Sequence, residues 1–148
     1  MFRNMVVTLD GSELSKKAME AAIQLAAEQK SVLYFLHVVK EVVVPPYVMG
    51  EMAYSNRDYD TELNNILYKE GEELLRRAKE QAKEKGVTSR IVMLKGDPAV
   101  EIIDFIKDHD IQLVVMGSRG LGAFKEMMLG SVSHKVAQIA PCPVMIVK

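Results

Sequence analysis

Short apolar runs alternate along this chain with longer segments of helical period. The first run, Asn4 to Leu9, is rich in β-branched residues and ends abruptly at Asp10-Gly11-Ser12. From 13 to 30, apolar residues return at three- and four-residue steps, which predicts a helix with one apolar face. Ser12 precedes this segment and is placed to cap it by accepting from a free amide of the first turn.

The same alternation continues to the end of the chain. We expect further strands at 32–39, 89–94, 111–116 and 144–147, and further helices at 62–85, 100–108 and 132–139. Residues 40–60 have no clear period and contain Pro45-Pro46, so a long loop, with at most a helical turn, is predicted there. Asp97 and Pro98 precede the 100–108 segment as candidate cap and first helical residue.

Strands that alternate with helices imply right-handed crossovers and one parallel sheet covered on both faces. The predicted fold class is therefore α/β, with an open, Rossmann-like five-stranded parallel sheet in a single domain, 1–148. The common strand orders are 3-2-1-4-5 and 2-1-3-4-5, and ligands bind such sheets where the winding direction reverses. In the order 3-2-1-4-5, Asp10-Gly11-Ser12 and Gly117-Ser118-Arg119-Gly120 follow neighbouring strands.

Composition and charge narrow the classes of partner. The net charge is −1 and basic residues are mixed with acidic ones, so we expect neither nucleic acid nor a membrane surface as partner. No signal peptide is evident, and no apolar stretch reaches the about 18 residues of a membrane span. The single cysteine, Cys142, cannot form an intrachain disulfide. A reducing, cytoplasmic location fits these features best.

The segment from Gly117 to Ser133 carries the most informative chemistry. Gly117 and Gly120 are followed, after nine residues, by Gly130 and Ser131 at the start of the last predicted helix. Glycine lacks a Cβ and lets a ligand approach backbone amides, and a helix N-terminus attracts phosphate. The hydroxyls of Ser131 and Ser133 and the charge of Arg119 or Lys125 would complement such a ligand. The alternative is that these glycines only form turns.

Asp10, at the end of the first strand, admits two interpretations. Its carboxylate is placed to bind a ribose or adenine, or to help hold a metal ion on phosphates. An Asp in this position also commonly caps the helix that follows. Its place at the predicted ligand edge favours contact with a ligand.

The chain resembles the universal stress proteins. Gly117, Gly120, Gly130 and Ser131 fit the pattern of that family's nucleotide-binding members, and 140–147, Ala-Pro-Cys-Pro-Val-Met-Ile-Val, is similar to the family's end. The resemblance implies the order 3-2-1-4-5, bound ATP, or AMP or ADP, with Mg²⁺ or Mn²⁺ on its phosphates, and a homodimer paired through 144–147. The binding residues that the motif or their position implies are Asp10, Val39, Met116, Gly117, Arg119, Gly120, Gly130, Ser131, Val132 and Ser133.

Several functions remain open at this point. The chain lacks the G-x-x-x-x-G-K-[ST] phosphate loop, the glycine-rich dinucleotide fingerprint and an evident general base, so at most a weak ATPase is expected. A regulatory nucleotide-binding protein, a dimeric interaction module without nucleotide and a flavin mononucleotide carrier are the alternatives. The histidines, His37, His109 and His134, show no metal-ligand spacing and are interpreted as structural.

Overall fold

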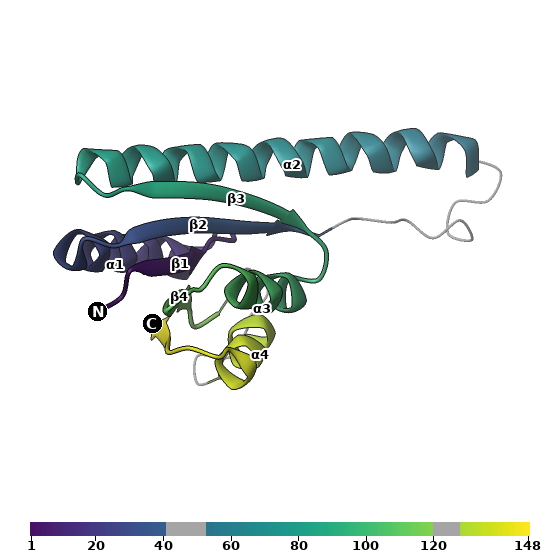
Figure 1. Cartoon of the computed structure of the whole chain (residues 1–148). Helices are drawn as coiled ribbons and strands as arrows, with labels where there is room; N and C mark the ends of the chain where they lie inside the picture. The colour runs from purple at the N-terminus through teal and green to yellow at the C-terminus, as the bar shows by residue number, and fades with distance from the viewer. Residues whose placement is uncertain (41–52, 120–127) are drawn as a thin grey trace.

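In the computed structural model of the chain, five strands and four helices alternate along the described residues. The structure describes residues 1–40, 53–119 and 128–148, with side chains in the second helix described from Thr61 onward. The elements are β1 (Asn4–Thr8), α1 (Glu13–Gln29), β2 (Val32–Val39), α2 (Ala53–Glu84), β3 (Ser89–Lys95), α3 (Pro98–Asp108), β4 (Leu113–Gly117), α4 (Ser131–Ile139) and β5 (Val144–Val147) (Figure 1).

All five strands join one parallel sheet in the order β3-β2-β1-β4-β5, which confirms the predicted order. β1 is central, and its Met5 lies opposite Leu33 of β2 on one side and Leu113 of β4 on the other. Because β2 lies on one side of β1 and β4 on the other, the winding direction reverses at β1. The carboxyl ends of β1, β2 and β4 therefore form the edge where this fold class binds ligands.

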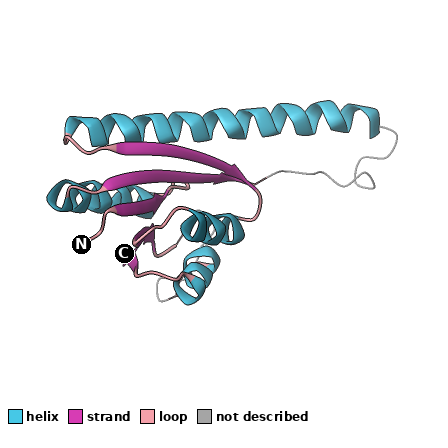
Figure 2. Ribbon diagram, viewed as in Figure 1, coloured by secondary structure: helices cyan, strands magenta, loops and turns pink. Residues whose placement is uncertain are grey.

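The helices cover the two faces of the sheet in pairs (Figure 2). In β1, Met5 and Val7 point into a core shared with α1 and α2, whereas Val6 points into a core shared with α3 and α4. The three side chains are fully buried. This alternation explains the continuous apolar run in the sequence, since a parallel strand covered on both faces needs apolar residues at every position.

Caps define the ends of the helices much as predicted. Ser12 accepts a hydrogen bond from the Ser15 amide at 3.2 Å and caps α1, which ends at Lys30 in the left-handed conformation (φ 56°). Asp97 accepts from the Val100 amide at 3.2 Å and caps α3, with Pro98 in its first turn. Each cap binds one of the amides that a helix start leaves without an intrahelical partner.

The loop predicted for 40–60 is wrong over its second part, because α2 begins at Ala53. Figure 1 shows α2 continuing past the ends of β2 and β3. A helical segment that extends past the sheet needs no apolar face, so its sequence shows no hydrophobic period. Residues 41–52, with Pro45-Pro46, lie outside the described residues. No helix among the described residues is long and apolar enough to cross a bilayer.

Candidate functional site

A hydrogen-bonded turn joins β1 to α1 at the carboxyl edge of the sheet. Asp10 Oδ1 accepts from the Ser12 amide at 2.9 Å and from Ser12 Oγ at 2.5 Å. Ser12 Oγ in turn accepts from the Ser15 amide, so it is Ser12 that caps the helix. Asp10 thus holds the turn and does not itself cap the helix, which was the structural role expected for it. No hydrogen bond to its second oxygen, Oδ2, comes from the described residues, which leaves that atom available to a ligand.

The end of β4 packs directly against this turn. A Cβ added to Gly117 would lie 3.0 Å from the carbonyl carbon and Cβ of Leu14, and 3.1 Å from the amide nitrogen of Ser15. Such distances are too short for any other residue unless α1 shifts. Gly117 therefore allows the first turn of α1 to touch the end of β4, and the two segments predicted to be neighbours are neighbours.

Hydrogen bonds also fix the start of α4 beside β4. The Gly130 amide donates to the Ser118 carbonyl at 2.8 Å, and buried Ser133 Oγ donates to the same carbonyl at 2.9 Å. The Ser118 amide donates to Val147 of β5. The hydroxyl of Ser133, which was expected to bind phosphate, thus stabilises the fold through the Ser118 carbonyl. The backbone amide of Ser133 is the group that stays available to a ligand.

The N-terminus of α4 has no side-chain cap, unlike those of α1 and α3. Gly130 occupies the cap position with an extended backbone (φ −61°, ψ 160°). The amides of Ser131, Val132 and Ser133 find no acceptor among the described residues. Free amides and the helix dipole give this point a partial positive charge.

The remaining predicted residues fall in different places. Val39 is buried at the end of β2, near Asp10, and Arg119 is half-buried just after β4. Met116 is buried in the core under α3 and α4, on the face of the sheet opposite α2, so it does not line the cleft described below. Gly120 and Lys125 lie outside the described residues.

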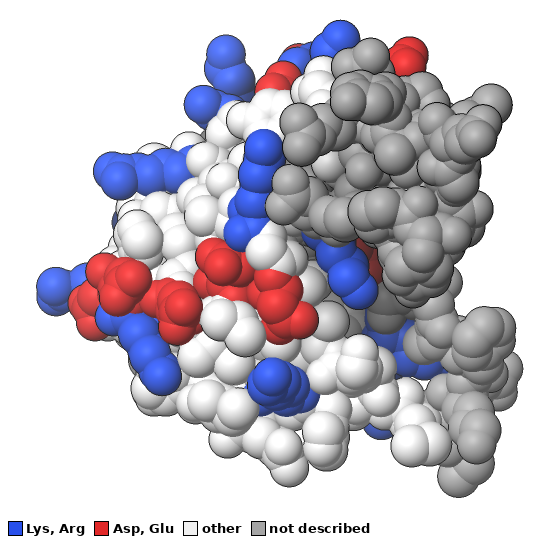
Figure 3. Space-filling model, turned by 90° about the vertical axis from the view of Figure 1, so that its right-hand side faces the viewer, with Lys and Arg blue, Asp and Glu red and all other residues white. Residues whose placement is uncertain are grey.

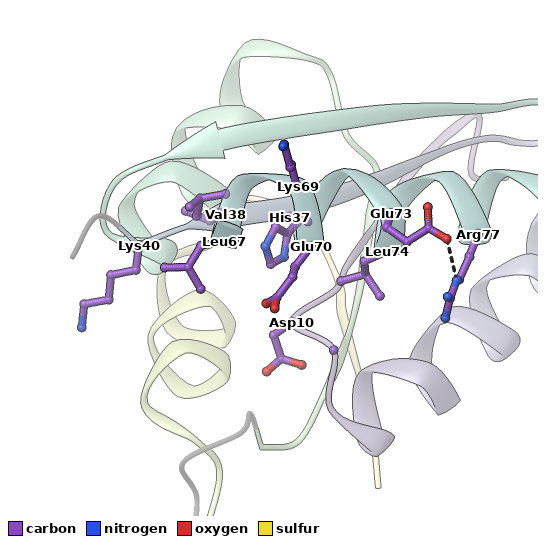
Figure 4. A pocket seen from close by; sticks show the side chains of 13 residues that line it. Asp10, His37, Val38, Lys40, Leu67, Lys69, Glu70, Glu73, Leu74 and Arg77 are labelled. Carbon is purple, nitrogen blue, oxygen red and sulfur yellow. Dashed lines mark hydrogen bonds and ion pairs between the residues drawn. The ribbon is translucent and has the colours of Figure 1, made fainter. Parts of the chain in front are cut away.

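A cleft of about 1020 Å³ opens between α2 and the carboxyl ends of β1 and β2 (Figure 4). This volume is large enough for a nucleotide-sized ligand. The strands and the β1–α1 turn contribute Asp10, Gly11, His37, Val38, Val39 and Lys40, and α2 contributes Leu67, Lys69, Glu70, Gly71, Glu73, Leu74 and Arg77.

Sequence reasoning missed the polar residues of this cleft, above all His37. The ring nitrogen Nδ1 of His37 lies 2.6 Å from the Leu9 carbonyl oxygen, one residue before Asp10. A Cβ on Gly71 of α2 would meet His37 Cδ2 at 2.6 Å and Nε2 at 3.0 Å, so the ring is packed against the helix backbone. A glycine inside a strong helical pattern and a histidine in an apolar strand were the available signals.

Charge is mixed around the site. Figure 3 looks onto the carboxyl edge of the sheet and shows acidic and basic side chains interspersed over the described surface. At one end of the cleft, the guanidinium groups of Arg76 and Arg77 donate to Glu73 and lower the pKa of its carboxyl from 4.5 to about 2. The described residues contain no group of three His, Cys, Asp or Glu side chains suited to hold a metal ion.

The sequence matches one family over its full length. The family model described as the universal stress protein family matches residues 1–148. The chain is 46% identical to the universal stress protein YxiE of Bacillus subtilis over 148 residues, which is all of both chains. A relative this similar and this fully covered shares the fold throughout.

Solved structures agree on the fold. The chain is similar to the universal stress protein UspA of Lactobacillus plantarum, with a TM-score of 0.86 and 22% identity over 99% of this chain and 97% of that one. It is also similar to a universal stress protein in complex with cAMP (TM-score 0.70, 25% identity, 99% and 96% covered). A family member from Arabidopsis thaliana with AMP bound gives a TM-score of 0.66 at 23% identity, over 99% and 91%.

Proposed function

The chain belongs to the universal stress protein family, and on this premise we propose that it is a nucleotide-binding regulatory protein of the stress response. We propose adenine nucleotides as its ligands and ATP as the preferred one. Structural neighbours of the chain are described as complexes with cAMP and AMP, which makes an adenine nucleotide the natural first candidate.

The observation that carries the proposal is the uncapped start of α4. Three successive amides, those of Ser131, Val132 and Ser133, lack an acceptor in the described part of the chain, and they directly follow Gly130 of the glycine motif. A phosphate group would accept from them and interact favourably with the helix dipole. The contact between Gly117 and the first turn of α1 brings Asp10 to the same edge, where its free Oδ2 suits a ribose hydroxyl.

A divalent ion would accompany the phosphates. At this edge the described residues place Asp10, toward which Glu70 extends from α2, but no group of three metal-ligating side chains. This donor set suits an Mg²⁺ or Mn²⁺ ion held mainly by phosphate oxygens, with Asp10 as a direct or water-mediated ligand. Such an ion neutralises the charge of the phosphates and can polarise them toward slow hydrolysis.

We further propose that the protein is a cytoplasmic homodimer paired through β5. Within the described residues β5 pairs only with β4, and Met145 on this strand is 39% exposed. An apolar edge strand is normally covered by another chain or protected. Met145→Lys should shift the dimer to monomer in light scattering at micromolar concentration. An unchanged mass would exclude pairing through this edge.

The decisive test of nucleotide binding combines release and titration. Nucleotide set free by denaturing the purified protein is identified by mass spectrometry, and ATP, ADP and AMP are titrated calorimetrically with and without Mg²⁺. Gly130→Val should weaken ATP binding about 100-fold or more, because a branched side chain at the helix start blocks phosphate while the extended backbone there accepts valine.

Gln138→Val, exposed in the last turn of the same helix, is the matched control and should bind as the unmodified protein does. Absence of binding by a folded protein would contradict the proposal and favour an interaction module without nucleotide. Release of inorganic phosphate over hours would identify a slow ATPase instead.

A further inference from the structure

The strand order places the parts of a bound nucleotide in a row along the sheet edge. The amides proposed to hold phosphate lie beside the end of β4, Asp10 follows β1, and the cleft lies over β2. Neighbouring strands are about 4.8 Å apart, so β4 and β2 are separated by about 10 Å. A nucleotide with its phosphate at α4 and its ribose at Asp10 would therefore direct its base toward β2.

The cleft at that point suits a flat base. Leu67 and Leu74 of α2 and Val38 and Val39 of β2 supply apolar lining. Of its polar residues, His37, Glu70 and Asp10 lie side by side, whereas Lys40 and Lys69 point away from them. Figure 4 shows Glu70 extending from α2 toward Asp10 beside the His37 ring. An aromatic ring fits such walls, and polar atoms on its edge decide which ring is accepted.

The hydrogen bond at Nδ1 fixes the chemistry of the other ring nitrogen of His37. Its partner, 2.6 Å away, is the Leu9 carbonyl oxygen, which can only accept, so Nδ1 carries the proton. In the neutral ring Nε2 then has a lone pair and acts as an acceptor. No described residue hydrogen-bonds to Nε2, Gly71 places no side chain over this edge of the ring, and His37 is among the residues that line the cleft.

We propose that His37 selects the base, by accepting at Nε2 a hydrogen bond from the exocyclic amino group of adenine. This inference rests on the proposed nucleotide function. The nearby carboxylate of Glu70 is also an acceptor, so a 6-oxo base such as hypoxanthine would bring its carbonyl oxygen against lone pairs. An acceptor left facing another acceptor in a cleft is a strong basis for discrimination.

The test compares ATP with inosine triphosphate (ITP), which replaces the 6-amino group by an oxygen. At pH 8 the full-length protein should bind ATP at least about tenfold more tightly than ITP. His37→Asn keeps a donor near the position of Nδ1, and so the bond to Leu9, but lacks Nε2. It should bind the two triphosphates within about twofold of each other.

Two further variants distinguish base recognition by His37 from a purely structural role of this residue. His37→Gln places its amide near the position of Nε2 and should retain part of the preference for ATP, because its oxygen can accept. Glu70→Gln is the matched control for the neighbouring acceptor and should change the ATP-to-ITP ratio less than His37→Asn does. A nitrogen-15 spectrum of the imidazole gives a readout independent of folding effects, since ATP, but not ITP, should shift the Nε2 resonance.

The outcomes distinguish this inference from the function on which it rests. If ATP and ITP bind equally well, or if His37→Asn retains the full preference, His37 does not select the base, although the protein remains a nucleotide-binding protein. If neither triphosphate binds, the proposed function fails, and the inference fails with it. A preference that depends on His37 and an Nε2 shift specific to ATP would together establish the inference.

Discussion

The two ends of the candidate site present different kinds of chemical group. On the α4 side, the groups proposed to bind are backbone amides, exposed by glycines and by a helix start without a cap. On the α2 side, they are side chains from β1, β2 and α2, which meet only in the folded chain. A site made of backbone requires glycine at fixed spacings and can be recognised in a sequence, whereas a site made of converging side chains leaves no local pattern.

Gly117 offers the strongest test of this comparison, because both ends of the site depend on its contact with the first turn of α1. Gly117→Val should lower the free energy of unfolding by about 2–3 kcal/mol, because its side chain would overlap the backbone of α1. Urea denaturation measures this free energy, and the value for Gly117→Ala should lie between those of the unmodified protein and Gly117→Val. Equal stability of all three proteins would show that α1 yields without cost and that the contact is unimportant.

Gly71 tests whether the α2 side is held by the packing of His37. Gly71→Ala should destabilise the protein by about 1–2 kcal/mol, since the new Cβ would collide with His37 and with Met93 Cε. In a His37→Ala background the same change should stabilise by about 0.5–1 kcal/mol, because alanine is the better helix former. A thermal or urea double-mutant cycle measures this coupling. If Gly71→Ala changed the stability with the same sign in both backgrounds, tight packing between the His37 ring and α2 would be contradicted.

Ser133 tests the α4 side in the same way, with a smaller effect expected. Ser133→Ala removes the buried hydroxyl that donates to the Ser118 carbonyl, and should cost about 1 kcal/mol of stability. The Ser118 carbonyl keeps its bond from the Gly130 amide, which limits the loss. Ser131→Ala, at an exposed position two residues earlier, is the control and should change stability by less than about 0.5 kcal/mol. Equal values for the two variants would refute the anchoring role.

The smallest effect concerns the ion pairs at the end of the cleft. Hydrogen bonds from Arg76, and then from Arg77, lower the pKa of Glu73 to about 2, below its ordinary value of 4.5. A carboxyl with a depressed folded-state pKa stabilises the fold above pH 4.5, and this contribution is lost as the pH falls toward 2. Because these groups are exposed, salt should weaken the effect.

Carbon-13 NMR of the Glu73 carboxyl measures this prediction directly. In Arg76→Gln/Arg77→Gln the midpoint of the titration should rise toward the ordinary value, and the loss of stability between pH 4.5 and 2 should become shallower. Lys79→Gln, an exposed cation on the same helix with no ion pair among those of the described residues, is the matched control. An unshifted midpoint in the double variant would show that the arginines do not hold Glu73.

The sequence alone determined the fold class and most of the element boundaries. Apolar runs of β-branched residues, caps such as Ser12 and Asp97, and the strict alternation of strand and helix are local signals, and local signals are readable along a chain. The glycine spacing from Gly117 to Ser131 belongs to the same class. It led to the family and to a hypothesis about phosphate, which the binding experiment tests.

Only the tertiary structure decided what lines the cleft and where α2 begins. His37, Glu70 and Gly71 come together because β2 and α2 pack face to face, and residues more than thirty positions apart carry no common period. The structure also placed the side chain of Met116 in the core on the face opposite α2, since side chains of successive strand residues point in opposite directions; its contact with a ligand stays a prediction. The hydroxyl of Ser133 donates to the Ser118 carbonyl, and this bond could not be foreseen because the two residues meet only in the folded chain. Contacts of this kind depend on positions in space, which local propensity and spacing do not encode.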